Sequence, residues 1–411
     1  MFEKCFYWKY NILLKCISYL SIFKFIYPKK YKNWFIQQKH IFNKLKKNKD
    51  RSIWIHCSSL GEYEHIKPLI THLKKINNNI NITFFSDSGY INFKDFKLVN
   101  QISYLPLDTK SNMEKFIFQI NPAIVIISKN DIWPNMITCI KNNNIPLYIV
   151  GFKMNKKKIK SWLMSKYYAL FLSKFDFIFS QDKITAQFLN TNNINTKIIG
   201  DLRIQQVLND SKSYSHDSKI TSFIKNKKII IYGSVEKSDY IIIKNIIESR
   251  KDVKHIIVPH EINNKSIQKL QNELFSNTVL YSEIENLKNW DHNILIIDVF
   301  GLLKFLYRYS NIAYIGGGFE EGVHNTLEPA IHGNLILFGP KHTNFEETLF
   351  FIEKRIACSI ENKLDFENKI NEWLIDHKSN NIIKDKIISF FTNKSNDLET
   401  ILHYLLKKIS K

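Results

Sequence analysis

Short apolar runs alternate with longer amphipathic stretches over most of the chain. Ser52–His56 is an apolar run of strand length, and Glu64–Lys75 has the spacing of an amphipathic helix. Five further runs repeat the pattern of the first: Ile80–Phe85, Ala123–Ser128, Ile145–Gly151, Phe175–Ser180 and Thr196–Gly200. Strands that alternate with helices are typical of a parallel sheet with helices on both faces.

A second series of the same kind follows the polar stretch Asn209–Lys219. Its predicted strands are Lys228–Tyr232, His255–Pro259, Ile294–Asp298, Ile312–Ile315 and Leu335–Phe338. Open α/β sheets bind their ligands at the carboxyl ends of the strands. We therefore expect the functional residues directly after the strands, in a cleft between two Rossmann-like domains that face each other.

The length of 411 residues allows two domains of about 150 residues with some chain left over. The predicted α/β organisation has four parts: an N-terminal helical segment over residues 1–45, one Rossmann-like domain over 46–208, a second over 220–375, and C-terminal helices over 376–411. The last part is expected to pack back on the first domain.

The N-terminal segment predicts contact with a membrane. Residues 2–28 are rich in apolar side chains but are interrupted by Lys4, Lys9, Lys15 and Lys24. A spanning helix has about 20 mostly apolar residues with few charges. A helix in the plane of the interface, with its lysines directed to anionic headgroups, therefore fits better. A single span and an ordinary amphipathic helix packed on the protein are the alternatives.

The formal net charge of +21 favours an anionic partner, such as nucleic acid, acidic lipid or a phosphorylated substrate. The lysines are scattered, so compositional drift explains the charge equally well, and no nucleic-acid-binding motif occurs. The five cysteines have no CxxC spacing, which indicates neither a disulfide framework nor a zinc site. Cys57 is not expected to be a nucleophile, because its neighbour His56 points to the opposite face of the strand.

The first candidate catalytic residues follow the first predicted strand, in the segment CSSLGEYEH. Gly61 allows a tight turn into the next helix. Glu62 falls in the first turn of that helix, where it is either a general base that faces the cleft or an ordinary helix-start glutamate. A later strand leads into DIWPN, in which Asp131 is a second carboxylate or a cap and Trp133 is a wall of the cleft.

The second series contains candidates for nucleotide binding. Gly233 and Ser234 are predicted at a helix start, where backbone N–H groups bind phosphate. Pro259 and His260 lie at the end of another strand.

The densest segment is Ala313–Pro340, which contains the glycines Gly316–Gly318 directly after a buried strand. His324 or Asn325 near a helix start suits a phosphate, and Glu328 one turn on suits ribose hydroxyls. The segment favours a nucleotide sugar, the alternative being a glycine-rich turn and a capped helix without a ligand.

Taken in order, these segments resemble those of the 3-deoxy-D-manno-octulosonic acid (Kdo) transferases, which are GT-B glycosyltransferases. The resemblance extends from about residue 30 to about residue 360. It rests on WIHCSSLGE, FSDSGY, YLPLD, DIWPN, IIGDLRI and the run from GGGF through GVHNTLEPAIHG to LFGPKHTNFEE. The ordered set is specific, because unrelated GT-B enzymes share only the glycine and glutamate features of the last segment.

The resemblance implies an inverting transfer of Kdo from CMP-Kdo to a tetra-acylated lipid A precursor, without a metal ion or a cofactor. Glu62 matches the catalytic base, and Asp131 stands for a glutamate of the family. The donor would contact Gly233, Ser234, Pro259, His260, Gly317, His324, Asn325 and Glu328, with Lys237 or His260 as a positive group near its phosphate. The acceptor would contact Ser59, Gly61, Ser88 and Trp133.

Such an enzyme would lie on the cytoplasmic face of the inner membrane, held peripherally or by a single anchor, and would contact anionic lipids but no nucleic acid. This sequence departs from the family's motifs at two places, one expected near the donor's phosphate and one near the second carboxylate. The family's Pro-Arg-His is Pro259, His260 and Glu261 here, and Lys129 stands where some members have an acid. The alternatives are another GT-B transferase that uses a UDP sugar on a membrane lipid, a polyanion-binding protein and an inactive relative.

Overall fold

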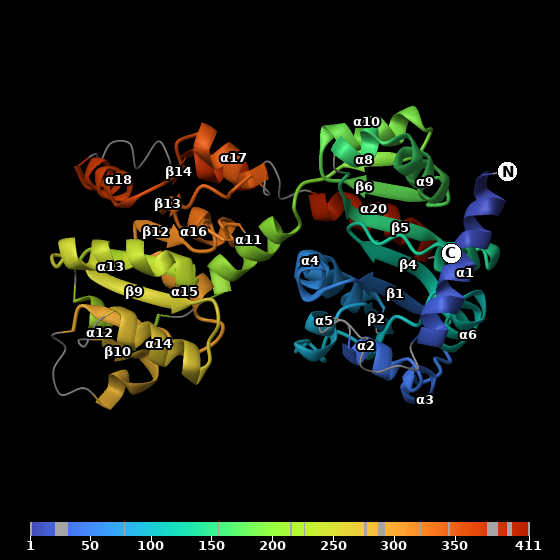
Figure 1. Cartoon of the computed structure of the whole chain (residues 1–411), viewed down its shortest axis with the longest axis horizontal. Helices are drawn as coiled ribbons and strands as arrows, with labels where there is room; N and C mark the ends of the chain where they lie inside the picture. Colours follow the sequence, from blue (N-terminus) through green and yellow to red (C-terminus); the bar gives the residue numbers. More distant parts are fainter. Residues whose placement is uncertain are drawn as a thin grey trace. The chain divides into compact units, whose positions relative to one another are not determined.

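The chain folds into two compact units. Unit 1 is Met1–Gln205 with Lys394–Lys411, and unit 2 is Gln206–Asn393. The computed structural model describes residues 2–20, 32–77, 79–154, 156–213, 216–225, 227–274, 278–286, 292–320, 322–343, 346–375, 385–392 and 397–409. Within these residues each unit contains one seven-stranded sheet in which all the neighbouring strands run parallel (Figure 1). The predicted α/β class with two parallel sheets is confirmed.

The sheet of unit 1 has the strand order β3-β2-β1-β4-β5-β6-β7. Its strands are β1 (Ser52–Cys57), β2 (Ile80–Phe84), β3 (Gln101–Tyr104), β4 (Pro122–Ser128), β5 (Leu147–Phe152), β6 (Phe177–Ser180) and β7 (Thr196–Ile198). The hydrophobic pattern predicted all of them except β3. That strand lies at the edge of the sheet and is only partly buried, so it has no continuous apolar run.

Helices cover both faces of this sheet because side chains alternate along each strand. Ile53 and Ile55 of β1 pack in one core with α4 (Leu60–Ile76), whereas Trp54 packs in the other core with α6 (Lys110–Ile120). The remaining helices that begin in unit 1 are α2 (Lys32–Gln37), α3 (Ile41–Lys44), α5 (Asp87–Ile91), α7 (Pro134–Asn142), α8 (Lys156–Lys160), α9 (Trp162–Leu172), α10 (Lys183–Thr191) and α11 (Arg203–Ser213).

The two ends of the chain add one helix each to unit 1. Helix α20 (Asp397–Ile409) buries Leu398, Ile401 and Leu405 in the core that contains α4. Helix α1 (Phe2–Leu20) packs by one side only: the ring of Phe6 lies 5.2 Å from that of Tyr167 on α9. Among the described residues, no helix combines the length and the apolar character needed to cross a bilayer. The lysine-containing stretch over residues 21–31 lies outside the described residues.

The sheet of unit 2 has the order β10-β11-β9-β8-β12-β13-β14. Its strands are β8 (Ile229–Val235), β9 (Lys254–Pro259), β10 (Thr278–Leu280), β11 (Ile294–Ile296), β12 (Ile312–Ile315), β13 (Leu335–Phe338) and β14 (Ala357–Ser359). The sequence pattern missed β10 and β14, which are three-residue strands at the two edges. Both have a residue that is partly or fully exposed, so neither forms a continuous buried run.

The helical segments of unit 2 connect these strands. They are α12 (Ser218–Ile224), η3 (Lys237–Asp239), α13 (Tyr240–Ser249), α14 (Asn264–Leu274), η4 (Tyr281–Asn286), α15 (Leu303–Leu306), η5 (Tyr307–Tyr309), α16 (Leu327–Ile331), α17 (Glu346–Glu353) and α18 (Lys363–Ile375). Residues 385–392 also belong to this unit, because Phe390 packs on Phe350 and Phe351 of α17.

Two glycines of unit 1 differ sharply in the space around them, which predicts opposite effects of substitution. A methyl group on Gly89 would lie 2.2 Å from the buried ring of Phe84, whereas one on Gly61 would meet nothing within 4 Å. We expect Gly89→Ala to lower the free energy of unfolding by about 1–3 kcal/mol. Gly61→Ala should leave it unchanged or raise it by up to about 1 kcal/mol. Urea denaturation of both variants checks this, and equal effects would contradict it.

Candidate functional site

Glu62 lies at the carboxyl edge of the sheet of unit 1, in the first turn of α4 directly after β1. Its carboxylate accepts a hydrogen bond from the backbone N–H of Ser58, and its own carbonyl accepts one from Ser128 Oγ at 2.9 Å. The positive end of the helix dipole favours a carboxylate at this position. The carboxylate is therefore held by the turn after β1, and the backbone of Glu62 is bound to the end of β4.

Asp131, which follows β4, is held by a histidine that sequence reasoning did not select. His56 Nε2 lies 2.7 Å from Asp131 Oδ2, and His56 Nδ1 lies 2.8 Å from Thr83 Oγ1. The ring of His56 is fully buried. The contacts of His56 join the neighbouring strands β2 and β1 to the segment after β4, and Asp131 is thereby the hydrogen-bond partner of a buried strand residue.

The two carboxylates titrate differently because their surroundings differ. Burial, together with the negative charge of Asp131, raises the pKa of Glu62 to about 7. Burial also acts against the ionised form of Asp131, but the hydrogen bond and charge of His56 outweigh it and hold the pKa of Asp131 below its ordinary value. One carboxylate thus stays ionised while the other can exchange a proton near neutral pH, which is the arrangement of an acid–base site.

The predicted acceptor-side residues Ser59, Ser88 and Trp133 have different surroundings in unit 1. Ser59 is the N-cap residue of α4, and Ser88 on α5 shares a 2.9 Å hydrogen bond with Ser86. Trp133 is half-buried, with its ring 5.0 Å from that of Phe85. Cys57 is fully buried, and burial raises the pKa of its thiol well above the ordinary value, which agrees with an unreactive residue.

The turn predicted at Gly61 was wrong. Gly61 is the second residue of α4, and its φ is not in the left-handed region, so the backbone there does not require glycine. What Gly61 provides is open space beside Glu62, because a methyl group there would meet nothing within 4 Å. A side chain would occupy that space.

In unit 2, Gly233 and Ser234 do not begin a helix as predicted. They lie in β8, at a bulge opposite the end of β9, and the short η3 begins only at Lys237. Gly233 is required by close packing, because a methyl group there would meet Tyr307 Oη at 2.0 Å. Ser234 has a φ of 53°, the left-handed region that serine rarely adopts. The strand therefore ends in a strained turn.

The glycine-rich loop after β12 is built around Asp239. This buried carboxylate accepts hydrogen bonds from Tyr314 Oη, from the N–H of Gly317 at 3.2 Å and from the N–H of Glu236 at 2.8 Å. Gly317 has a φ of 85°, and a methyl group on it would lie 2.9 Å from the ring of His324. The loop can therefore hold His324 close only because residue 317 is glycine.

His324 and His260, both predicted donor contacts, are brought together. Their rings are stacked with centroids 4.3 Å apart and planes 10° apart. Glu236, which sequence reasoning did not select, contacts the same group: its Oε1 lies 2.9 Å from His324 Nε2. Pro259 precedes His260 at the end of β9, and Lys237 is exposed in η3.

The other predicted donor contacts pair with each other at the start of α16. Asn325 donates a 2.9 Å hydrogen bond to Glu328 Oε1 and accepts one from the backbone N–H of Leu327. Glu328 precedes Pro329 within the first turn, where proline is tolerated. The predicted set in unit 2 thus forms two local groups, one around His324 and one around Glu328.

Comparison with known proteins adds the class and the family. A family model described as "3-Deoxy-D-manno-octulosonic-acid transferase (kdotransferase)" matches residues 33–206. The 3-deoxy-D-manno-octulosonic acid transferase of Rickettsia typhi is 26% identical over 378 residues, which are 86% of this chain and 79% of that protein. A bifunctional glycosyltransferase/methyltransferase of Fusobacterium nucleatum is 27% identical over 361 residues, which are 82% of this chain but only 54% of that protein. The chain thus spans about half the length of this bifunctional relative.

A solved glycosyltransferase structure from Rickettsia africae has a TM-score of 0.57 with this chain, at 14% identity, and the match covers 89% of this chain and 100% of that one. Together with the two parallel sheets, this likeness places the chain in the class of GT-B-like folds. The family model and the sequence relatives are more specific. Residues 33–206 match the Kdo transferase family model, and most of the chain is similar to Kdo transferases, which are glycosyltransferases, as the resemblance in the sequence had indicated.

The raised pKa of Glu62 predicts that its ionised form reduces stability. In the folded state the group loses its proton near pH 7, whereas an unfolded glutamate does so near 4.5. Stability is therefore lost as the pH rises between these values. Glu62→Gln removes the charge, and we expect it to raise the free energy of unfolding at pH 8 by about 1–3 kcal/mol. At pH 4 the difference should vanish. Urea denaturation at both pH values measures it, and a variant destabilised at pH 8 would contradict the expectation.

Proposed function

We propose that the protein transfers Kdo from CMP-Kdo to a hydroxyl group of a tetra-acylated lipid A precursor, with inversion at the anomeric carbon. The observation that supports this most strongly is Glu62, a partly buried carboxylate with a pKa of about 7 that lies near the carboxylate of Asp131. A family relationship alone would suggest the reaction class. The titration of Glu62 adds a group suited to accept the acceptor's proton.

In the proposed step, Glu62 takes the proton from the acceptor hydroxyl as its oxygen attacks the anomeric carbon of Kdo. The bond from that carbon to the phosphate oxygen breaks, and CMP leaves with the electron pair. Asp131 keeps its charge through its contact with His56, so protonation of Glu62 relieves the repulsion between the two carboxylates. Gly61 would leave room for the acceptor beside the base.

Unit 2 would hold the donor. The turn of Gly233 and Ser234 and the loop at Gly317 present backbone that a phosphate can approach closely. His324 and His260 would supply imidazole donors to the anionic groups, in place of the arginine found in many family members. Glu328, now paired with Asn325, would accept hydrogen bonds from ribose hydroxyls. These contacts do not select cytidine over uridine, so a UDP-sugar transferase is the second candidate.

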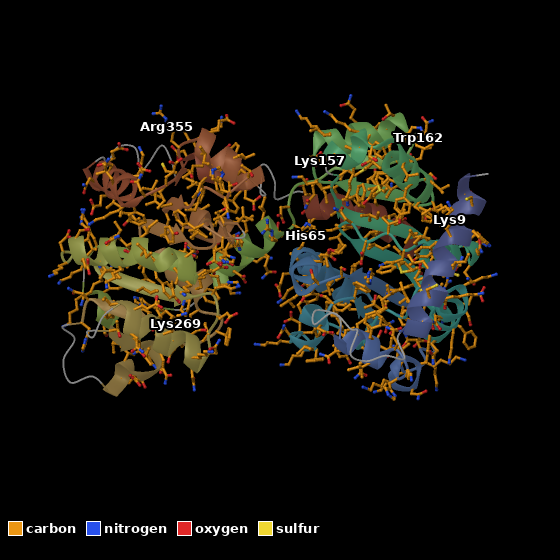
Figure 2. All side chains as sticks on the ribbon, viewed as in Figure 1. Lys9, His65, Lys157, Trp162, Lys269 and Arg355 are labelled. Carbon is orange, nitrogen blue, oxygen red and sulfur yellow. The ribbon has the colours of Figure 1, made fainter. Side chains whose placement is uncertain are left out.

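The lipid acceptor would be reached from the membrane surface next to unit 1. Trp8 on α1 and Trp162 on α9 are each 66% exposed, and Ile12, Leu13 and Leu163 are exposed beside them in sequence. Lys9 is exposed as well (Figure 2), and Nζ of the exposed Lys166 lies 4.1 Å from the centroid of the Trp162 ring. Exposed tryptophans with lysines nearby are typical of surfaces that enter the headgroup region. We propose peripheral contact with the anionic inner leaflet through α1 and α9.

Transfer should depend on Glu62 and on pH. With CMP-Kdo and the tetra-acylated precursor, we expect wild-type protein to give product masses raised by one or more Kdo residues. The rate should rise with pH through about 7 as Glu62 loses its proton. Glu62→Gln should bind CMP normally but transfer about 10²–10⁴-fold more slowly. Mass spectrometry of the product and calorimetric titration with CMP are the two measurements.

Glu64→Gln is the matched control, because Glu64 lies on the same helix but its side chain is 49% exposed. An active Glu62→Gln variant would overturn the assignment of the base. Turnover of a UDP sugar but not of CMP-Kdo would favour the second candidate. Salt-sensitive binding to any polyanion without turnover of either donor would favour the polyanion-binding alternative.

Membrane contact should depend on the two exposed tryptophans. We expect the double variant Trp8→Ser, Trp162→Ser to bind vesicles that contain phosphatidylglycerol at least tenfold more weakly than the wild type, measured by co-sedimentation. Neutral phosphatidylcholine vesicles should bind wild-type protein weakly, because the lysines lose their partners. Ile241→Ser serves as the control, since Ile241 is 74% exposed on α13 of unit 2. An equal loss in the control would refute the assignment of the surface.

A further inference from the structure

Three potential metal ligands converge at the carboxyl edge of the sheet of unit 2. Glu236 follows β8, His260 follows β9, and His324 belongs to the loop after β12. These three strands are neighbours in the sheet, with β8 in the middle. Each side chain offers one ligand atom, and the three atoms lie within 4.8 Å of one another. Among the described residues, no other group of three His, Cys, Asp or Glu side chains is arranged in this way.

The three groups are held close by structure that does not depend on a ligand. Asp239 binds the backbone N–H groups of Glu236 and Gly317, which fixes the two segments that carry Glu236 and His324. The absence of a side chain at Gly317 lets the ring of His324 pack against the loop. The N–H of His260 donates a 3.0 Å hydrogen bond to the carbonyl of Val235, the residue before Glu236. The ligand atoms are therefore held within 4.8 Å of one another by backbone contacts that need no ion.

The ligand types and spacings suit a transition-metal ion. Two imidazoles with one carboxylate are ligands of Zn²⁺, Co²⁺ and Ni²⁺, and ligand distances of about 2.0–2.2 Å place neighbouring tetrahedral ligands about 3.3 Å apart. The 2.9 Å separation of His324 Nε2 and Glu236 Oε1 is already close to this. An ion would take the place of the proton that now lies between them.

If Glu236 served only to orient His324 by one hydrogen bond, the ring of His260 would not need to be stacked on the ring of His324, with centroids 4.3 Å apart. The presence of His260 as a third ligand therefore distinguishes a metal site from a simple pair of Glu236 and His324.

We propose that Glu236, His260 and His324 form a binding site for a divalent transition-metal ion. Three protein ligands leave a fourth position for water or for an anionic oxygen of a bound ligand. The inference does not rest on the proposed Kdo transfer, which needs no metal in its chemistry. Because His260 and His324 are also the proposed donor contacts, an ion here would be positioned to meet the donor's phosphate.

The experiment uses full-length protein without a histidine tag, titrated with Co²⁺ and followed by visible absorption, and with Zn²⁺ by calorimetry. We expect one ion per chain and the intense visible bands of tetrahedral cobalt. His260→Ala and His324→Ala should each weaken binding at least 100-fold, and Glu236→Gln, which keeps a hydrogen-bonding side chain, at least tenfold. His403→Ala should bind as the wild type does, because His403 is an exposed histidine on α20 of unit 1.

Thermal denaturation without metal shows whether each variant is folded; His260 is exposed and His324 is a quarter exposed, so little loss of stability is expected. Wild-type protein that binds no cobalt, or alanine variants that bind it as well as the wild type, would overturn the proposal. Cobalt bands typical of thiolate ligands would do so as well, because they would locate the ion at a cysteine. A protein that binds the ion but transfers no Kdo would refute the proposed function and leave this site intact.

Discussion

Parallel pairing of every strand is the constraint on which both candidate sites depend. Each connection must return the chain to the same edge of the sheet, so the residues that follow successive strands gather there. In unit 1 this brings Glu62, after β1, near Asp131, after β4, although the two are far apart in the sequence. In unit 2 it brings the ends of β8, β9 and β12 together. The first strand of each sheet in chain order, β1 or β8, is central to these contacts. In unit 1 it lies between β2 and β4, and in unit 2 between β9 and β12.

Buried charge is the second common feature of the two edges. In unit 1 the ionised Asp131 is compensated by His56 and leaves Glu62 as the group that gains or loses a proton. In unit 2 Asp239 is compensated by two backbone N–H groups and the hydroxyl of Tyr314, so it organises the loop rather than taking part in chemistry. Each edge therefore contains one carboxylate with its hydrogen bonds satisfied, which positions more accessible groups. Asp131 and Asp239 are positioning residues for this reason.

The hydrophobic pattern predicted every strand within the described residues except β3, β10 and β14, all of which lie at a sheet edge and are only partly buried. Turn and helix-start signals in the sequence were less successful in predicting the local conformation of individual glycines. Gly61 looked like a turn glycine but lies in ordinary helix geometry, and Gly233 looked like a helix start but lies within a strand. Gly233 is explained by close packing against Tyr307, which is far away in the sequence, whereas a side chain at position 61 would meet open space.

The sequence alone determined the α/β class, the two series of strands, the position of Glu62 after the first strand and the resemblance to the Kdo transferases, because these follow from local periodicity and from motifs in a fixed order. Only the tertiary structure decided which side chains meet. His56 was visible as a strand residue, and Glu236 as a polar residue after a strand. Their contacts with Asp131 and His324 arise from strand neighbours in the folded sheet. Burial and charge pairing act through space, so the pKa of Glu62 could not be read from its neighbours in the chain.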